Sequence, residues 1–433
     1  MNWFESDKKH VWHPFTQMQT APIPVAIESA KDEFLFTSDN RKIIDGISSW
    51  WVTLHGHNHP HIVKAIQDQA AKLDQVIFAG FAHEPAAKLS KNLVSLWNNK
   101  LPKVFFSDDG STAVEVAIKL SVQSRKNVGD LKKTKIIALE NAYHGDTLGA
   151  MSVGARSSFT AAFDDWLFEV VRIPAPVADS GPTTEIHKRK SLEALEKLLV
   201  SDHDTISALI VEPMVQGAGG MLMWAEGALK EMRDLTKKYN VHLIADEIMV
   251  GFGRTGKLFA SQHESVYPDI VCLSKGLTGG FLPLSVTMCT EEIYNNFLSD
   301  DRLKTFFHGH SYTANPIACA AANASLEVWE KEKTLEKIKV IENYHLSRTT
   351  EYRQNSKVLD VRVSGTIFAI EIQQPEGGYF SKIGPKLYDF YLSNNVLLRP
   401  LGNVVYILPP YCISEESLKK CHDVLLKSLE LVG

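Results

Sequence analysis

The sequence predicts an α/β protein whose large domain contains a mostly parallel sheet with helices on both faces. Short apolar runs of strand length alternate with helical patterns between residues 104 and 273. Such alternation is typical of βα units, because each crossover helix packs against one face of a parallel sheet. Near both chain ends the runs are instead paired around short turns, which predicts a smaller α+β domain formed by the two termini.

The length of 433 residues favours two domains, since a single core rarely grows so large. We expect a large domain at residues 59–330, with residues 1–58 and 331–433 forming the small one. Strands are expected at residues 25–27, 34–37 and 42–44 around a Ser-Asp-Asn turn. Residues 157–190 contain several prolines and no clear period, which predicts an irregular surface excursion with a helix only from residue 192 to 199.

Composition excludes several classes of protein. The net charge of −5 offers no basic surface for nucleic acid or an anionic membrane. No apolar run approaches the roughly 18 residues of a spanning helix, and the first residues lack a signal-peptide core. Five scattered cysteines without CxxC spacing argue against a disulfide framework and against a metal site of the zinc type. A soluble, cytoplasmic protein is expected.

Two of the apolar runs end on residues that can perform chemistry. Residues 241–245 lead into Asp246, and residues 270–273 are followed by Lys275. Ligands of open α/β sheets bind at strand ends. A lysine in apolar surroundings can lose its proton and attack a carbonyl, and an aspartate facing the pyridine nitrogen is its usual partner in pyridoxal phosphate enzymes. The pair predicts such an enzyme; the alternative is two solvated surface charges.

Three further strand ends carry polar or aromatic residues. Gly110 and Ser111 open a helix directly after a strand, where free backbone N–H groups favour a phosphate, although an ordinary helix cap is the alternative. Tyr143 could stack on a flat cofactor or could be a simple loop tyrosine. Glu212 ends the run at residues 206–211. We expect these strand ends to converge on one site.

Adjacent tryptophans lie in an irregular Gly- and His-rich stretch, residues 44–60. Such rings are good pocket walls because they are large and rigid. We expect Trp50 to line a pocket and Trp51 to pack in the core. Phe15 belongs to an aromatic N-terminal segment that either fixes this arm to the body or forms part of the same wall.

Several specific motifs run through nearly the whole chain, from residue 12 to about residue 410. They are WHPF (residues 12–15), DGISSWW (45–51), GSTAVEVA (110–117), YHGDT (143–147), VEPMVQGAGG (211–220), ADEIMVGFGRTG (245–256) and LSKGLTGG (273–280). Together they resemble the class III, fold type I aminotransferases, and most closely the diaminopelargonate aminotransferase branch of biotin synthesis.

The resemblance implies pyridoxal 5′-phosphate as the cofactor. Lys275 would hold it as an aldimine and then move the proton between the substrate carbon and the cofactor, and Asp246 would keep the pyridine nitrogen protonated. The other matching cofactor-binding positions are Gly110, Ser111, Tyr143 and Ser311. Ser311 would reach the phosphate of the neighbouring subunit, so a homodimer with shared active sites is implied.

The resemblance also implies a ping-pong conversion of 8-amino-7-oxononanoate to 7,8-diaminononanoate. Arg399 would bind the carboxylate, since a guanidinium suits a bidentate pair. The other substrate-binding positions would be Phe15, Trp50, Asp146 and Gly309, with Tyr143 also forming the channel wall. S-adenosylmethionine is the expected amino donor, with lysine as the alternative.

Three features depart from the family pattern, two single residues and one two-residue turn. Phe15 stands where many relatives have tyrosine, which removes a hydroxyl. His310 and Ser311 resemble the turn of members thought to use lysine, so both donors stay open. Met249 replaces a glutamine of other class III branches.

Two residue roles and two rival functions stay open. Glu212 and Arg254 could each act in the site or support its structure. The rival functions are an ω-amino acid or diamine transaminase and a non-catalytic vitamer-binding protein.

Overall fold

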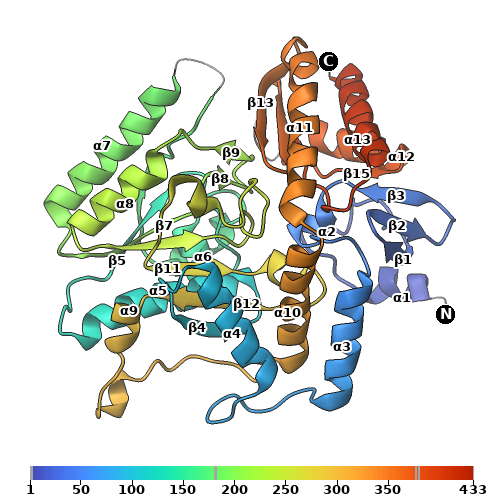
Figure 1. The fold of residues 1–433 in the computed structure, drawn as a ribbon. Coiled ribbons are helices and arrows are strands. Elements are labelled where there is room, and N and C mark those ends of the chain that lie inside the picture. Colours follow the sequence, from blue (N-terminus) through green and yellow to red (C-terminus); the bar gives the residue numbers. More distant parts are fainter. Residues whose placement is uncertain (1–2, 180–182, 376–377, 379–380, 433) are drawn as a thin grey trace.

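A seven-stranded sheet forms the centre of the protein in a computed structural model that describes residues 3–179, 183–375, 378 and 381–432 (Figure 1). Its strands are, in spatial order, β4 (Lys103–Ser107), β12 (Ser285–Cys289), β11 (Ile270–Leu273), β10 (His242–Asp246), β7 (Ile206–Val211), β5 (Lys135–Leu139) and β6 (Val171–Ile173). β12 runs antiparallel to both neighbours, and the other pairs are parallel. The prediction of a mostly parallel sheet is confirmed.

Helices cover both faces of this sheet. Those that follow or flank its strands are α3 (Pro60–Lys72), α4 (Glu84–Leu96), α5 (Gly110–Asn127), α6 (Leu148–Val153), α7 (Thr184–Asp202), α8 (Ala228–Lys238), α9 (Glu291–Asn295) and α10 (Pro316–Lys331). Short 3-10 turns lie at Ala161–Trp166, Ala260–Glu264, Lys275–Thr278 and Arg302–Lys304. Ile210 of β7 packs in the cluster that includes α5, whereas its neighbours Leu209 and Val211 pack in the cluster of α7 and α8. Alternate side chains therefore face opposite helix layers, as strand geometry requires.

Both chain ends contribute to the smaller α+β part, as predicted. One sheet contains β1 (Ile27–Lys31), β2 (Phe34–Thr37), β3 (Lys42–Asp45) and β15 (Val396–Leu397) in that order, and a second contains β13 (Val358–Ser364), β14 (Ile367–Ile372) and β16 (Val404–Ile407). Its helices are α1 (Trp3–His10), α2 (Ser48–Trp51), α11 (Thr334–Arg353), α12 (Ile383–Ser393) and α13 (Glu415–Ser428), followed by a 3-10 turn at Leu429–Leu431. Because β15 pairs with β3, the blue N-terminal strands lie beside the red C-terminal elements (Figure 1). A two-stranded ribbon, β8 (Val215–Gln216) and β9 (Leu222–Met223), lies outside these three sheets.

Two expectations about strands and helices were wrong. The first strand begins at Ile27 and not at residue 25, because the apolar start of that run lies before the pairing with β2. The excursion at residues 157–190 contains β6 and the first turns of α7, which spans far more than residues 192–199. β6 has only three residues, and α7 opens with polar and charged residues that show no apolar period. Residues 180–182 of this excursion lie outside the described part.

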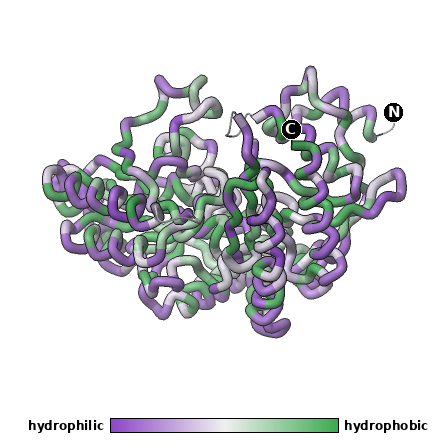
Figure 2. The backbone as a smooth tube through the Cα atoms, turned by 90° about the horizontal axis from the view of Figure 1, so that it is seen from above, coloured by the Kyte–Doolittle hydropathy of each residue, from purple (hydrophilic) through white to green (hydrophobic). Residues whose placement is uncertain are grey.

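Apolar segments run through the middle of the molecule, whereas the outermost turns are largely polar (Figure 2). Strands β7, β10 and β11 are buried along their whole length, as expected for strands covered on both faces. Among the described helices, none combines the length and apolar character needed to cross a bilayer.

Replacing Trp97 with alanine should destabilise the large domain by about 3–5 kcal/mol, because the change empties a closely packed site. Trp97 is 1% exposed and stacks on Phe259 with the ring centroids 4.4 Å apart. The free energy of unfolding from a urea titration measures the effect. Trp166→Ala is the matched control, since that ring is 74% exposed and its loss should change the free energy by no more than about 0.5 kcal/mol. Equal effects of the two changes would contradict the packing described.

Candidate active site

The polar strand ends of the large sheet meet around one cavity of about 440 Å³. Its lining includes all of the strand-end residues singled out in the sequence, namely Gly110, Ser111, Tyr143, Glu212, Asp246 and Lys275. Parallel pairing explains the convergence. Ala245 lies opposite both Val211 and Val271, so β7, β10 and β11 end at the same edge of the sheet.

Asp246 is held from two sides at the end of β10. His144 Nδ1 lies 2.7 Å from one carboxylate oxygen, and the Ile248 N–H donates to the other at 3.0 Å. His144 is buried, and its Nε2 has no partner among the described residues. Asp246 therefore has a fixed orientation toward the cavity. His144 was not predicted as a site residue, although its place in the YHGDT motif directly after Tyr143 was a usable signal.

Lys275 lies just beyond β11 with a left-handed backbone, φ +45°. Its Nζ is 5.3 Å from the centre of the Trp51 ring. Burial lowers the pKa of Lys275, while the carboxylates of Asp246 and Glu212 act in the opposite direction. A lowered pKa increases the share of neutral amine, which is the form that attacks a carbonyl carbon.

The N-terminus of α5 lies at the same cavity. Asp109 caps the helix by accepting from the Thr112 N–H at 2.9 Å, whereas the N–H groups of Gly110 and Ser111 have no acceptor within the described chain. A Cβ at position 110 would stand 2.9 Å from Ile248 Cγ2. Free N–H groups at the positive end of an 18-residue helix suit a phosphate.

Tyr143 and Glu212 form the wall on the β5–β7 side. The N–H groups of Tyr143 and Gly217 each donate to the Glu212 carboxylate at 3.0 Å. Burial raises the pKa of Glu212 to about 7, and Asp246 acts in the same direction. Burial and the charge of Asp146 likewise raise the pKa of Tyr143, whose hydroxyl donates to Asp146 at 3.0 Å. Glu212 thus fixes the backbone that carries the Tyr143 ring.

A strained turn carries both tryptophans. Trp51 is buried in the core as predicted, but it also lines the cavity. Trp50 is not among the residues that line this cavity; its ring lies 4.8 Å from the Arg399 guanidinium and 5.3 Å from the ring of Phe15. The four residues of this turn, Ser48–Trp51, have left-handed backbone. This conformation costs roughly 1–2 kcal/mol per residue, and strain of this kind is concentrated at functional sites.

Arg254 supports the same loop from behind. It is 1% exposed and donates to the carbonyl oxygens of Pro409 at 3.0 Å, Trp51 at 3.2 Å and Thr53 at 3.3 Å. Two roles were left open for Arg254, and these contacts favour the role of holding the loop.

Ser311 and Gly309 lie on a loop outside the cavity of this chain. The side-chain amide of Gln75 donates to the Ser311 carbonyl at 2.6 Å, and His310 lies 3.4 Å from Asp108 on the cavity rim. The loop is thus tied to the rim, but a single chain does not bring Ser311 into the cavity beside Lys275.

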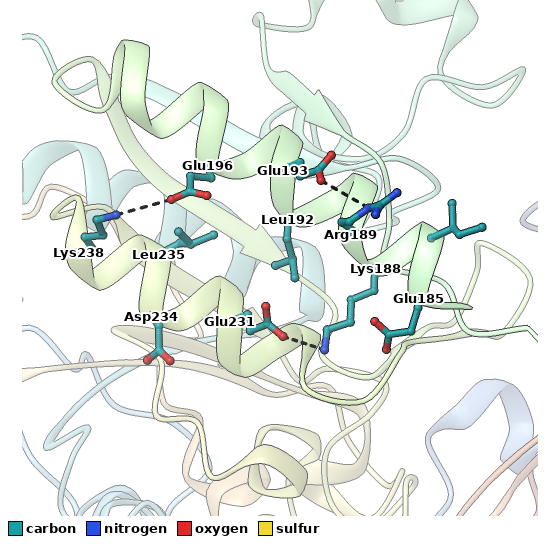
Figure 3. Close-up of a pocket in the computed structure, with 11 residues that line it drawn as sticks. Glu185, Lys188, Arg189, Leu192, Glu193, Glu196, Glu231, Asp234, Leu235 and Lys238 are labelled. Carbon is teal, nitrogen blue, oxygen red and sulfur yellow. Dashed lines mark ion pairs between the residues drawn. The ribbon is translucent and has the colours of Figure 1, made fainter. Parts of the chain in front are cut away.

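A second depression, of about 610 Å³, lies between α7 and α8 on the outside of the molecule (Figure 3). Charged side chains line it and pair across it: Lys188 with Glu231 at 2.7 Å, and Lys238 with Glu196 at 3.6 Å. None of its lining residues is a strand-end residue. It is a charged groove between two surface helices, remote from Asp246 and Lys275.

The residues of the cavity fit pyridoxal 5′-phosphate. The helix N-terminus at Gly110 offers free donors for the phosphate, Asp246 offers a fixed carboxylate for the ring nitrogen, and Lys275 offers an amine of lowered pKa. The 440 Å³ volume lies in the usual range for cofactor pockets.

Comparison with known proteins agrees with this fit. A family model described as aminotransferase class-III matches residues 15–429. The adenosylmethionine-8-amino-7-oxononanoate aminotransferase of Synechococcus elongatus is 46% identical over 422 residues, covering 97% of this chain and 98% of that protein. The protein of the same name from Aquifex aeolicus is 40% identical and covers 98% and 97%.

Solved structures agree as well. The crystal structure of adenosylmethionine-8-amino-7-oxononanoate aminotransferase from Methanocaldococcus jannaschii is 34% identical with a TM-score of 0.93, covering 99% of this chain and 98% of that one. A PLP-bound amine transaminase from an uncultivated Pseudomonas species is 27% identical with a TM-score of 0.92, covering 98% and 99%. This chain therefore belongs to the class-III aminotransferase family and is a pyridoxal phosphate-dependent transaminase.

Proposed function

We propose that this enzyme aminates 8-amino-7-oxononanoate to 7,8-diaminononanoate in biotin synthesis, with S-adenosylmethionine as the amino donor. The names of the full-length relatives support the substrate and donor. The observation that carries the proposal is the half-buried Arg399, which has no ion-pair partner among the described residues and lies over the Trp50 ring. An unpaired guanidinium on an aromatic wall suits the carboxylate of a long keto acid.

Five residues of the cavity then have defined tasks. Bound pyridoxal phosphate supplies an electron sink for the carbon that loses its proton. Lys275 Nζ moves that proton, which requires its neutral form. Asp246 would keep the ring nitrogen protonated, the Gly110 and Ser111 N–H groups would bind the phosphate, and the Tyr143 ring would pack against the cofactor.

The keto acid would lie along the aromatic wall. Phe15, Trp50 and Tyr143 form its apolar side, and Arg399 binds the far carboxylate. Asp146 would meet the 8-amino group. Asp146 accepts a hydrogen bond from the hydroxyl of Tyr143, which lines the cavity, and this contact supports the role.

Amino-transfer assays test the proposal directly. Purified enzyme is incubated with 8-amino-7-oxononanoate and either S-adenosylmethionine or lysine, and diaminononanoate is measured. Product with S-adenosylmethionine is expected. Product formed with lysine but not with S-adenosylmethionine would show that lysine is the donor. It would agree with the resemblance of the His310–Ser311 turn to that of members thought to use lysine. No product with either donor would contradict the biotin assignment and favour an ω-amino acid or diamine transaminase.

The proposed assembly is a homodimer in which Ser311 and Gly309 complete the neighbouring active site. Their position on a rim loop outside their own cavity supports this arrangement. The same region exposes the large apolar side chains of Ile77, Phe307 and Tyr312, which a partner subunit would cover. Sedimentation of the purified protein tests it: a dimer is expected, and an active monomer would contradict it.

We further propose the domain division at residues 59 and 331 and a cytoplasmic location. The pairing of β3 with β15 supports a small domain shared by residues 1–58 and 331–433, of which the structure describes all but residues 1–2, 376–377, 379–380 and 433. All five cysteines are free thiols, which suits a reducing compartment.

Replacing Arg399 with alanine should raise KM for the keto acid by about 10- to 100-fold, the loss expected for hydrogen bonds between charged groups. The rate constant kcat should change much less, because Arg399 does not touch the reacting atoms. Steady-state kinetics at fixed donor concentration measures the effect. Arg353→Ala is the control, since that arginine is exposed at the end of α11. An unchanged KM would remove Arg399 from the substrate site.

A further inference from the structure

One short turn, Ser48–Trp51, places two neighbouring aromatic rings at two different sites. Trp51 lies beside Lys275 in the cofactor cavity, and Trp50 lies against Arg399 at the proposed keto-acid site. The two tryptophans are adjacent in sequence, so the conformation of the turn sets the positions of both rings. Contacts that hold this turn therefore also hold the aromatic wall of the keto-acid site.

The turn is left-handed throughout. Ser48, Ser49, Trp50 and Trp51 have φ values of 51°, 50°, 86° and 74°, and none of them is glycine. Side chains of L-residues oppose this conformation, so four such residues in succession require support from outside the turn.

Asp45 supplies that support from the end of β3. Its carboxylate is 0% exposed. One oxygen accepts from the N–H groups of Ile47 at 3.3 Å and Ser49 at 2.9 Å, and the other accepts from the Ser49 hydroxyl at 2.7 Å. A buried carboxylate is stable only when its oxygens are satisfied in this way. The turn and the charge therefore stabilise each other.

His57 completes the arrangement. Its Nε2–H donates to the second Asp45 oxygen at 2.9 Å, and its ring is mostly buried. The His57 backbone pairs in both directions with Asp32, at 2.7 and 3.1 Å, which ties the histidine to the β1–β2 hairpin. The Asp45 carboxylate is thereby tied to the β1–β2 hairpin as well as to the turn.

We infer that Asp45 and His57 are positioning residues, which lock the left-handed turn Ser48–Trp51 and so place Trp50 against Arg399 to bind the keto acid. The inference rests on the proposed function for its kinetic consequence only. Neither residue lines the cavity, so both act through the turn.

The test compares Asp45→Asn, Trp50→Ala and the double variant. Asparagine keeps the size of the side chain but loses the charge and one acceptor. Hydrogen–deuterium exchange of the peptide covering residues 46–53 should become faster in Asp45→Asn, because the amides of the turn lose their fixed acceptor. KM for the keto acid should rise about tenfold, with a smaller change in kcat because Trp51 keeps its indole hydrogen bond to the Tyr406 hydroxyl. In the Trp50→Ala background the same change should raise KM no further, since both act through one ring.

Asp39→Asn in the exposed β2–β3 turn is the matched control and should alter neither readout. Unchanged exchange in residues 46–53, or effects on KM that multiply in the double variant, would overturn the inference. His57→Ala gives the same comparison if Asp45→Asn does not fold. If the wild-type enzyme fails to aminate the keto acid, the proposed function fails, and the exchange measurement still decides whether Asp45 locks the turn.

Discussion

Replacing Lys275 with alanine should lower kcat for amino transfer by at least about 10⁴-fold, because the change removes both the amine that binds the cofactor and the group that moves the proton. The side chain lies in a cavity and has no hydrogen-bond partner among the described residues, so its loss should leave the fold intact. Steady-state rates and thermal unfolding measure the two effects separately.

Lys100→Ala serves as the control for the Lys275 variant, because Lys100 is exposed and does not line the cavity. Its kcat should equal that of the wild-type enzyme. Repeated turnover by the Lys275→Ala enzyme would show that another group moves the proton, and the role of Lys275 would then be wrong.

Replacing Asp246 with asparagine should lower kcat by about 10²- to 10³-fold, the usual cost of losing one preorganised electrostatic contact in an active site. Asparagine has nearly the same shape but carries no charge to stabilise a protonated ring nitrogen. It also presents an amide where His144 now meets a carboxylate oxygen at 2.7 Å. Steady-state kinetics measures the effect, and the cofactor absorbance should shift as the ring nitrogen loses its proton.

The neighbouring Glu247 offers a matched control for Asp246. Its buried carboxylate points away, accepting from the N–H groups of Ala260 at 2.8 Å and Ser261 at 2.7 Å. Glu247→Gln should lower thermal stability while kcat stays near the wild-type value. An Asp246→Asn enzyme with full activity, or a Glu247→Gln enzyme as impaired as it, would contradict the assignment.

Much of the fold could be predicted because its strands have a strong local pattern. Strands β7 and β11 occupy the residues expected of them, since fully buried parallel strands are continuous apolar runs. β6 and the start of α7 were missed for the opposite reason. A three-residue edge strand has too few positions for a period, and the first turns of α7 carry charges with little apolar face.

The strand-end residues of the site were predictable because parallel strands bring their ends to one edge. Contacts between distant segments were not. His144 and Asp246 are 102 positions apart, and no local pattern relates them. The left-handed turn at Trp50 was equally hidden, since residues 48–51 contain no glycine to mark it and its support comes from Asp45 and from the distant segment around residue 408.

Lys275 is the lysine expected to carry the cofactor, opposite Asp246, and chemical trapping of the cofactor shows which lysine holds it. Purified holoenzyme is reduced with sodium borohydride, digested and mapped by mass spectrometry. We expect the reduced pyridoxal phosphate on the peptide containing Lys275 and on no other lysine. Attachment at a different lysine, or a protein that carries no reducible cofactor, would contradict it.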